Sequence, residues 1–165
     1  MEIEKKFQLK ALPDLSGYQK KEIEQGYLCT DPVVRIRKSD DQYILTYKSK
    51  VGIEPSGIVA QVNQEMEVPL HEKAYQHLRE KVDNHLIRKS RYVIPLADGH
   101  TGELDVFHGV LEGLAFIEVE FESEEAASAF CPPEWFGDNV SMDKRYTNSF
   151  LSKCEDLTVF PKETK

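Results

Sequence analysis

The sequence contains no apolar run close to the roughly 20 residues that a membrane-spanning helix needs. It has no basic excess either, because 21 Lys and Arg against 29 Asp and Glu give a formal net charge of −8. General nucleic-acid binders and proteins of anionic membrane surfaces usually carry a basic excess, so both classes of partner are disfavoured. Three scattered cysteines and a charged start, Met1 to Lys6, favour reduced thiols and no signal peptide. We therefore expect a cytoplasmic protein.

Motifs of several common active sites are also missing. The five histidines show no His-Glu-x-x-His spacing, which disfavours a zinc site of that kind. There is no Walker glycine loop and no Gly-x-Gly-x-x-Gly motif, so phosphate binding at such a helix N-terminus is not expected. Apolar residues make up 40% of the 165 residues, enough for the core of one domain. We expect that domain over residues 1–157, with 158–165 as a frayed tail.

Most of the chain alternates with period two, which predicts strands. We expect eight of them, near residues 2–8, 21–29, 33–38, 42–50, 58–68, 86–95, 101–108 and 114–122. Helical signals are fewer. An apolar stripe covers about 70–82, a stretch capped by Ser123 runs to about Phe130, and a last helix is expected over about 144–154.

The unusual feature of these strands is that charged residues two apart share a sign. Side chains at i and i+2 lie on one face of a strand, so each pair points the same way. The pairs are Glu2/Glu4, followed by Lys6, and Arg35/Arg37, Lys48/Lys50, Glu65/Glu67, Lys89/Arg91, Glu103/Asp105 and Glu118/Glu120. The opposite face is apolar in most strands. One face of the predicted sheet is therefore hydrophobic and the other carries both carboxylates and cations.

Two interpretations of this pattern compete. An ordinary half-exposed antiparallel sheet would turn its polar face to water. Like charges two residues apart lie roughly 6.5 Å from each other, and at an effective dielectric of about 20 their repulsion costs about 2.5 kcal/mol per pair. A closed sheet with its charges inside explains the pairs better, because acidic pairs can hold a metal ion and basic pairs a polyanion. Helices or the partner subunit of a homodimer would then cover the outer apolar face.

The chain also resembles the CYTH superfamily, the triphosphate tunnel metalloenzymes, through its Glu2-Ile3-Glu4-Lys5-Lys6 signature. Further segments follow in order: Gln25-Gly26-Tyr27-Leu28, Arg35-Ile36-Arg37, Leu45-Thr46-Tyr47-Lys48, Glu65-Met66-Glu67, Lys89-Ser90-Arg91, Glu103-Leu104-Asp105-Val106-Phe107, Glu118-Val119-Glu120-Phe121 and Asp143-Lys144-Arg145-Tyr146. The chain is most similar to the short bacterial members that hydrolyse inorganic triphosphate. The resemblance implies a mainly β fold, a closed eight-stranded antiparallel β-barrel that forms a tunnel with a charged interior and helices packed outside.

The resemblance implies a small-molecule polyphosphate substrate, held by cations on several walls of the tunnel. The candidate substrate-binding residues are Lys6, Arg35, Arg37, Lys48, Lys50, Lys89, Arg91 and Lys144. It also implies a cofactor, Mg²⁺ or Mn²⁺, on the carboxylates of Glu2, Glu4, Glu118 and Glu120. Glu65, Glu67, Glu103 and Asp105 are either further ligands or side chains that orient the basic residues.

Two routes to the nucleophile stay open. The simpler one is a metal-bound water activated by a carboxylate such as Glu4 or Glu120. The resemblance offers Tyr27 with Lys48 as a base dyad, since a nearby ammonium lowers the pKa of a phenol. Rival substrates within the same fold are thiamine triphosphate and nucleoside triphosphates, the latter including the class IV adenylate cyclase reaction. A polyphosphate-binding module without turnover is the non-enzymatic alternative.

Overall fold

The computed structural model describes residues 1–54 and 59–160. Within these residues the strands form one antiparallel sheet in the order β5-β4-β3-β2-β6-β7-β8-β1-β9. The strands are β1 (Glu2–Leu9), β2 (Gln19–Thr30), β3 (Val33–Ser39), β4 (Gln42–Ser49), β5 (Gln61–Pro69), β6 (Asp83–Pro95), β7 (Thr101–Phe107), β8 (Ala115–Glu120) and β9 (Phe136–Asn139). The helices are α1 (Glu72–Arg79), α2 (Glu124–Ala129) and α3 (Asn148–Leu151), with short 3₁₀ turns η1 (Gly109–Leu111) and η2 (Lys144–Tyr146).

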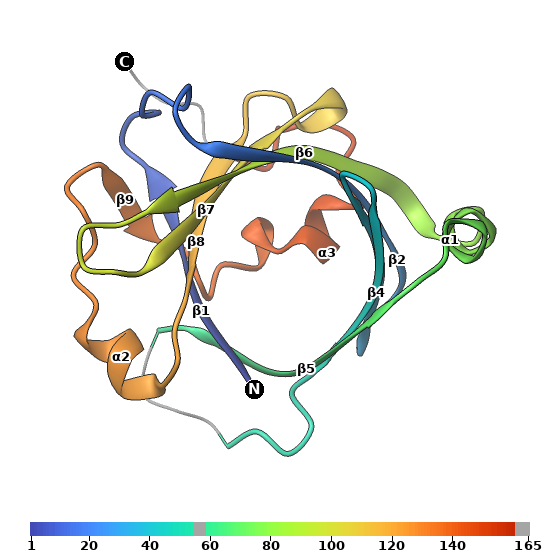
Figure 1. The fold of residues 1–165 in the computed structure, drawn as a ribbon, viewed down its shortest axis with the longest axis horizontal. Helices are drawn as coiled ribbons and strands as arrows, with labels where there is room; N and C mark the ends of the chain where they lie inside the picture. The colour runs from blue at the N-terminus through green and yellow to red at the C-terminus, as the bar shows by residue number, and fades with distance from the viewer. Residues whose placement is uncertain (55–58, 161–165) are drawn as a thin grey trace.

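The first strand closes the sheet into a barrel, as Figure 1 shows. One edge of β1 pairs with β8, placing Glu4 opposite Glu120. The other edge pairs with β5 near its start, where Glu2 faces Asn63. This confirms the closed sheet that the alternation favours and the eight-stranded antiparallel barrel that the resemblance implies.

The sequence did not predict β9. After Glu4, β1 diverges from β5, and the freed edge pairs with β9 through Phe7 and Asn139. The sequence of β9, Phe-Gly-Asp-Asn, has low strand propensity. The strand forms because the exposed β1 edge offers unpaired backbone groups.

The other elements lie near their expected positions with shifted ends. β5 is first seen at Gln61, and residue 58 of the expected strand lies outside the described residues. The helix expected over 144–154 is split into η2 and α3. Thr147 between them is extended, and its hydroxyl accepts a hydrogen bond from the Phe150 backbone N–H at 3.2 Å, so it caps a new helix instead of continuing the old one.

Apolar packing lies outside the sheet and at one end of it. A cluster that includes Phe7, Phe130 and Phe136 packs outside the barrel beside α2, and the Trp135 ring meets Phe136 edge to face. A second cluster, including Phe116, Tyr146 and Leu151, anchors the η2–α3 segment at one end of the barrel (Figure 1).

Helices do not cover all of the outer apolar face. On β4 and β5, Tyr47, Met66 and Val68 remain 37%, 64% and 41% exposed.

The end of the chain is described only as far as Phe160, whose ring packs on Tyr146. The rest of the expected tail, residues 161–165, lies outside the described residues. Of the helices in residues 1–54 and 59–160, none combines the length and apolarity needed to cross a membrane.

Candidate active site

A cavity of about 480 Å³ lies inside the barrel, and all eight barrel strands contribute charged side chains to its wall. The strands place these side chains there because one face of each strand points inward. The charged residues on the wall that the sequence predicted are Glu2, Glu4, Lys6, Arg35, Arg37, Lys48, Lys50, Glu65, Glu67, Arg91, Glu103, Glu118 and Glu120. Three others, Lys89, Asp105 and Lys144, do not line it.

One part of the wall is acidic and short of positive charge. Burial raises the pKa of Glu2 to about 7, helped by its hydrogen bond with Glu65. Burial and the neighbouring charges of Glu118 and Glu2 raise the pKa of Glu4 well above its usual range. Burial and the charges of Glu2 and Glu65 also raise the pKa of Glu120. Because these carboxylates repel one another, the cluster favours the binding of a cation.

Lys48 supplies part of the missing charge. Its Nζ lies 3.0 Å from Oε1 of Glu2 and 3.4 Å from Oε2 of Glu65. Tyr27, the other half of the predicted base dyad, is buried and also lines the cavity. Among the hydrogen bonds of the described residues, none joins the Tyr27 hydroxyl to Lys48. The structure therefore brings Lys48 to the carboxylates, and within the described residues it forms no hydrogen bond with the phenol.

Glu118 differs from its acidic neighbours because cations surround it. Its carboxylate lies 3.8 Å from Nζ of Lys6 and 3.9 Å from Nη2 of Arg91. Although burial acts in the opposite direction, Lys6 and Arg91 hold the pKa of Glu118 well below its usual range. Lys6 also donates to the Tyr146 carbonyl oxygen at 2.5 Å, so the η2 turn helps to fix it.

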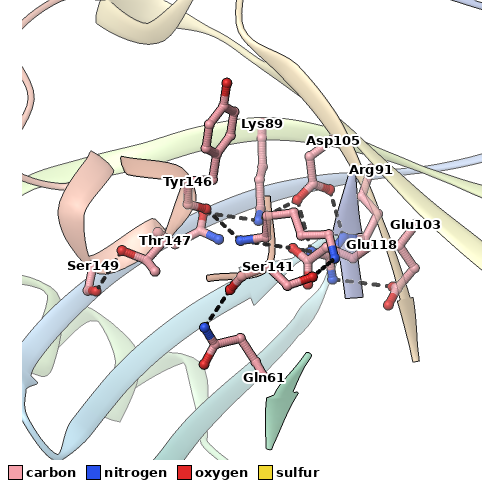
Figure 2. Close-up of polar contacts among 12 residues, drawn as sticks. Gln61, Lys89, Arg91, Glu103, Asp105, Glu118, Ser141, Tyr146, Thr147 and Ser149 are labelled. Carbon is pink, nitrogen blue, oxygen red and sulfur yellow. Dashed lines mark hydrogen bonds and ion pairs between the residues drawn. The ribbon is translucent and has the colours of Figure 1, made fainter. Parts of the chain in front are cut away.

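Beneath the cavity lies a buried ion network, shown in Figure 2. Asp105 is fully buried and accepts from Lys89 Nζ at 2.8 Å. Arg91 binds the same carboxylate through Nε at 2.8 Å and Nη2 at 3.0 Å, and reaches Glu103 at 3.2 Å through Nη1. Burial opposes the shift, but Arg91 and Lys89 lower the pKa of Asp105. This geometry makes Lys89 and Asp105 supports for Arg91.

The basic part of the wall comes from β3. Arg35 is 6% exposed, and its Nη2 donates to the Thr46 hydroxyl at 3.2 Å. Its Nε is buried and has no hydrogen-bond partner within the described part of the chain. Arg37 donates from Nε to Oε1 of Gln25 at 2.8 Å. Because an unpaired buried donor is costly, Arg35 is suited to an anionic ligand in the cavity.

The remaining predicted residues lie at the rim or outside the cavity. Lys50 and Glu67 are exposed at the rim, and Lys50 donates to Gln61 at 2.9 Å. Lys144 is exposed. Its neighbour Arg145 forms an ion pair with Asp143 at 2.6 Å.

The sequence reasoning missed several polar residues of the cavity wall. They are Lys21, Gln61, Asn63, Ser141, Thr147, Asn148 and Ser149. The run of three polar residues after Tyr146 could have indicated that this segment faces the polar cavity. The run was not recognised because one continuous helix was expected over this region.

The acidic residues fit a hard divalent cation in their chemistry, since such ions prefer carboxylate oxygens. Glu4 and Glu120 face each other across β1 and β8. Glu2 lies two residues from Glu4 on β1, and Glu118, which faces Lys6, lies two residues from Glu120 on β8. Within residues 1–54 and 59–160, no three acidic, His or Cys side chains already converge as a metal site. Instead, Lys48 lies against Glu2, and Lys6 lies near Glu118.

Comparison with known proteins agrees with this architecture. A family model described as the CYTH domain matches residues 1–131. An inorganic triphosphatase of Nitrosomonas europaea is 39% identical over 154 residues, which cover 92% of this chain and 96% of that protein. An inorganic triphosphatase of Acetivibrio thermocellus is 35% identical over 154 residues, covering 92% and 93%. A crystal structure of an inorganic triphosphatase matches with a TM-score of 0.65 at 38% identity, covering 92% of this chain and 94% of that one. The resemblance seen in the charged strand pairs is thus confirmed, and the chain belongs to the CYTH domain family.

Proposed function

We propose that the protein is a metal-dependent inorganic triphosphatase, which hydrolyses tripolyphosphate to pyrophosphate and phosphate inside the barrel. Two relatives that match most of the chain carry the name inorganic triphosphatase. The structural observation that carries the proposal is the buried, unpartnered Nε of Arg35 on the wall of a charged cavity. A bound phosphate would supply an acceptor for this guanidinium.

Tripolyphosphate carries about four or five negative charges, so its site needs several cations. Arg35 and Arg37 present guanidinium groups that suit two-point contact with phosphate oxygens. Arg91 adds a third, held rigidly by Asp105, while Lys6 and Lys48 supply point charges. The cations lie on different strands and therefore surround a linear anion from several sides.

Glu2, Glu4, Glu118 and Glu120 are the residues that would hold Mg²⁺ or Mn²⁺. The bound ion would neutralise charge on the phosphate oxygens and lower the pKa of a coordinated water. Lys48 lies against Glu2 and Glu65, so its ammonium would compete with a cation for these carboxylates. Lys6 lies near Glu118 in the same way, so two of the cations are placed against carboxylates of the proposed metal site.

The proton of the attacking water needs an acceptor. Glu4 and Glu120 line the cavity, and burial together with neighbouring carboxylates raises their pKa values, which makes them stronger proton acceptors than exposed glutamates. The alternative dyad of Tyr27 and Lys48 would need Lys48 to leave Glu2 and Glu65 and approach the phenol. We therefore favour a carboxylate base, and keep the dyad as the hypothesis that the pH profile of Lys48 variants tests.

The test is a product analysis with a matched pair of variants. With magnesium, the wild-type protein should release one phosphate and one pyrophosphate per tripolyphosphate, and a chelator should abolish the reaction. Arg35→Lys keeps the charge but loses Nε and the planar fork, so KM should rise about tenfold or more. Lys38→Met, on the same strand but outside the cavity beside Tyr43, is the control and should leave KM unchanged. A rate of hydrolysis that is unchanged in the presence of the chelator would refute the proposal.

A further inference from the structure

The η2–α3 segment brings an unassigned side chain to the cavity. Asn148 is the first residue of α3, and lines the cavity on the same side as Gln25 and Arg37. It is half-buried, and it lies there because Thr147 interrupts the preceding turn and caps α3. The interruption thus turns a polar side chain of the C-terminal region toward the charged interior.

Two fixed donors set the orientation of the Asn148 amide. Its Oδ1 accepts from Nε2 of Gln25 at 3.0 Å and from Nζ of Lys89 at 3.3 Å. Gln25 and Lys89 are both fully buried. Gln25 is itself held because its Oε1 accepts from Arg37, and Lys89 is held by Asp105. Since both donors need an acceptor, the oxygen of Asn148 must face them and its nitrogen must point elsewhere.

The Nδ2 group of Asn148 therefore keeps two N–H donors for another partner. Among the hydrogen bonds of residues 1–54 and 59–160, Asn148 uses only its oxygen in its side-chain contacts. The chain from Arg37 through Gln25 to Asn148 also joins the basic wall to α3. Within the described part of the chain, Asn148 thus lines the cavity with a free pair of N–H donors and is linked through Gln25 to Arg37.

We propose that Asn148 is a substrate-binding residue, which donates from Nδ2 to a phosphoryl oxygen and holds Arg37 in place through Gln25. The inference rests on the proposed function for the identity of the ligand. It also assigns the contribution of the C-terminal region to Asn148 in place of Lys144, which is exposed and does not line the cavity. A neutral amide suits this position because Lys89 and Arg37 already bring positive charge close to it.

Asn148→Asp separates binding from folding. The carboxylate keeps an acceptor for Gln25 and Lys89, so the melting temperature should equal or exceed that of the wild type. Its second oxygen replaces the Nδ2 donor and repels phosphate, so KM for tripolyphosphate should rise at least about tenfold. A hydrogen bond to a charged group commonly contributes this much. Asn84→Asp, an exposed position outside the cavity, adds the same charge elsewhere and is the matched control.

Calorimetric titration with tripolyphosphate in the presence of a chelator gives a second readout that needs no turnover. Asn148→Asp should bind at least about tenfold more weakly than the wild type and Asn84→Asp. Asn148→Ala, which removes the donor without adding a charge, should weaken binding less, by about threefold to tenfold. If the wild type binds tripolyphosphate but does not hydrolyse it, the proposed function fails while this inference stands. If Asn148→Asp and Asn148→Ala both bind like the wild type, or if the wild type does not bind, the inference is wrong.

Discussion

Asp105→Asn should destabilise the protein severely, because Asp105 is the shared counter-ion of two buried cations. Its carboxylate is fully buried, lies 2.8 Å from Lys89, and receives two hydrogen bonds from Arg91. The substitution keeps the shape of the side chain and removes only its charge. It therefore leaves buried positive charge without compensation, which is the situation that makes broken buried ion pairs costly.

The magnitude follows from what each cation can do without Asp105. Breaking a buried pair typically costs about 3–5 kcal/mol. Burial lowers the pKa of Lys89 to about 7, so this amine can lose its proton. Arg91 cannot lose its proton. Glu103 and Glu118 remain near Arg91, however, and partly compensate its charge. We therefore expect the lower end of the range, about 3 kcal/mol. For a domain of this size, that corresponds to a fall in melting temperature of about 6–12 °C.

Chemical denaturation and thermal melting of the metal-free protein measure this loss. Glu103→Gln is the matched control on the same strand, because Glu103 is 37% exposed in its side chain and makes a single contact with Arg91. It should cost less than about 1 kcal/mol, as exposed ion pairs do. If Asp105→Asn melts like the wild type and instead weakens metal binding, then Asp105 is a metal ligand and the buried network is misread.

Three further predictions concern the cavity. Glu4→Gln should fold normally and lose metal-dependent turnover about a hundredfold or more, and near-normal activity at ordinary magnesium would show that Glu4 is not a ligand. Lys48→Met removes the cation beside Glu2, so calorimetry without substrate should show metal binding about tenfold tighter, whereas a shifted alkaline limb of the pH–rate profile would instead support the dyad with Tyr27. The raised pKa of Glu2, about 7, means that the folded state binds more protons than the unfolded state between pH 4.5 and 7. Glu2 should therefore make the metal-free protein less stable as pH rises across that window, and should make its affinity for metal higher. Denaturation and metal titrations at pH 5 and 7.5 measure the two effects, and comparison with Glu2→Gln isolates the part due to Glu2.

The barrel could be predicted because the like-charge pairs on its strands would be electrostatically unfavourable in an ordinary open sheet. Arg35 and Arg37, like Glu118 and Glu120, repel each other on one strand face, and only a shared interior provides the opposite charges that offset this. The same alternation located every barrel strand to within a few residues. It also identified most of the charged residues that line the cavity, because side-chain direction in a strand follows from sequence position alone.

Features that depend on how strands meet could not be predicted in this way. Lys89 and Asp105 follow the inward pattern, yet they are fully buried against each other, since the depth of a side chain within the barrel depends on strand register. β9 forms only where β1 leaves β5, which no local pattern records. Asn148 reaches the cavity because Thr147 interrupts the helix, a competition between capping and helix continuation that periodicity does not resolve.

Phosphate release from three substrates tests the central claim most directly. The wild-type protein is compared on tripolyphosphate, ATP and thiamine triphosphate, each with magnesium and with a chelator. The cavity contains an unpartnered Arg35 donor and a cluster of carboxylates. The account therefore predicts fast hydrolysis of tripolyphosphate with magnesium, slower reaction of the two organic triphosphates, and no reaction with the chelator. Equal slow turnover of all three substrates, or turnover that the chelator leaves unchanged, would contradict the account.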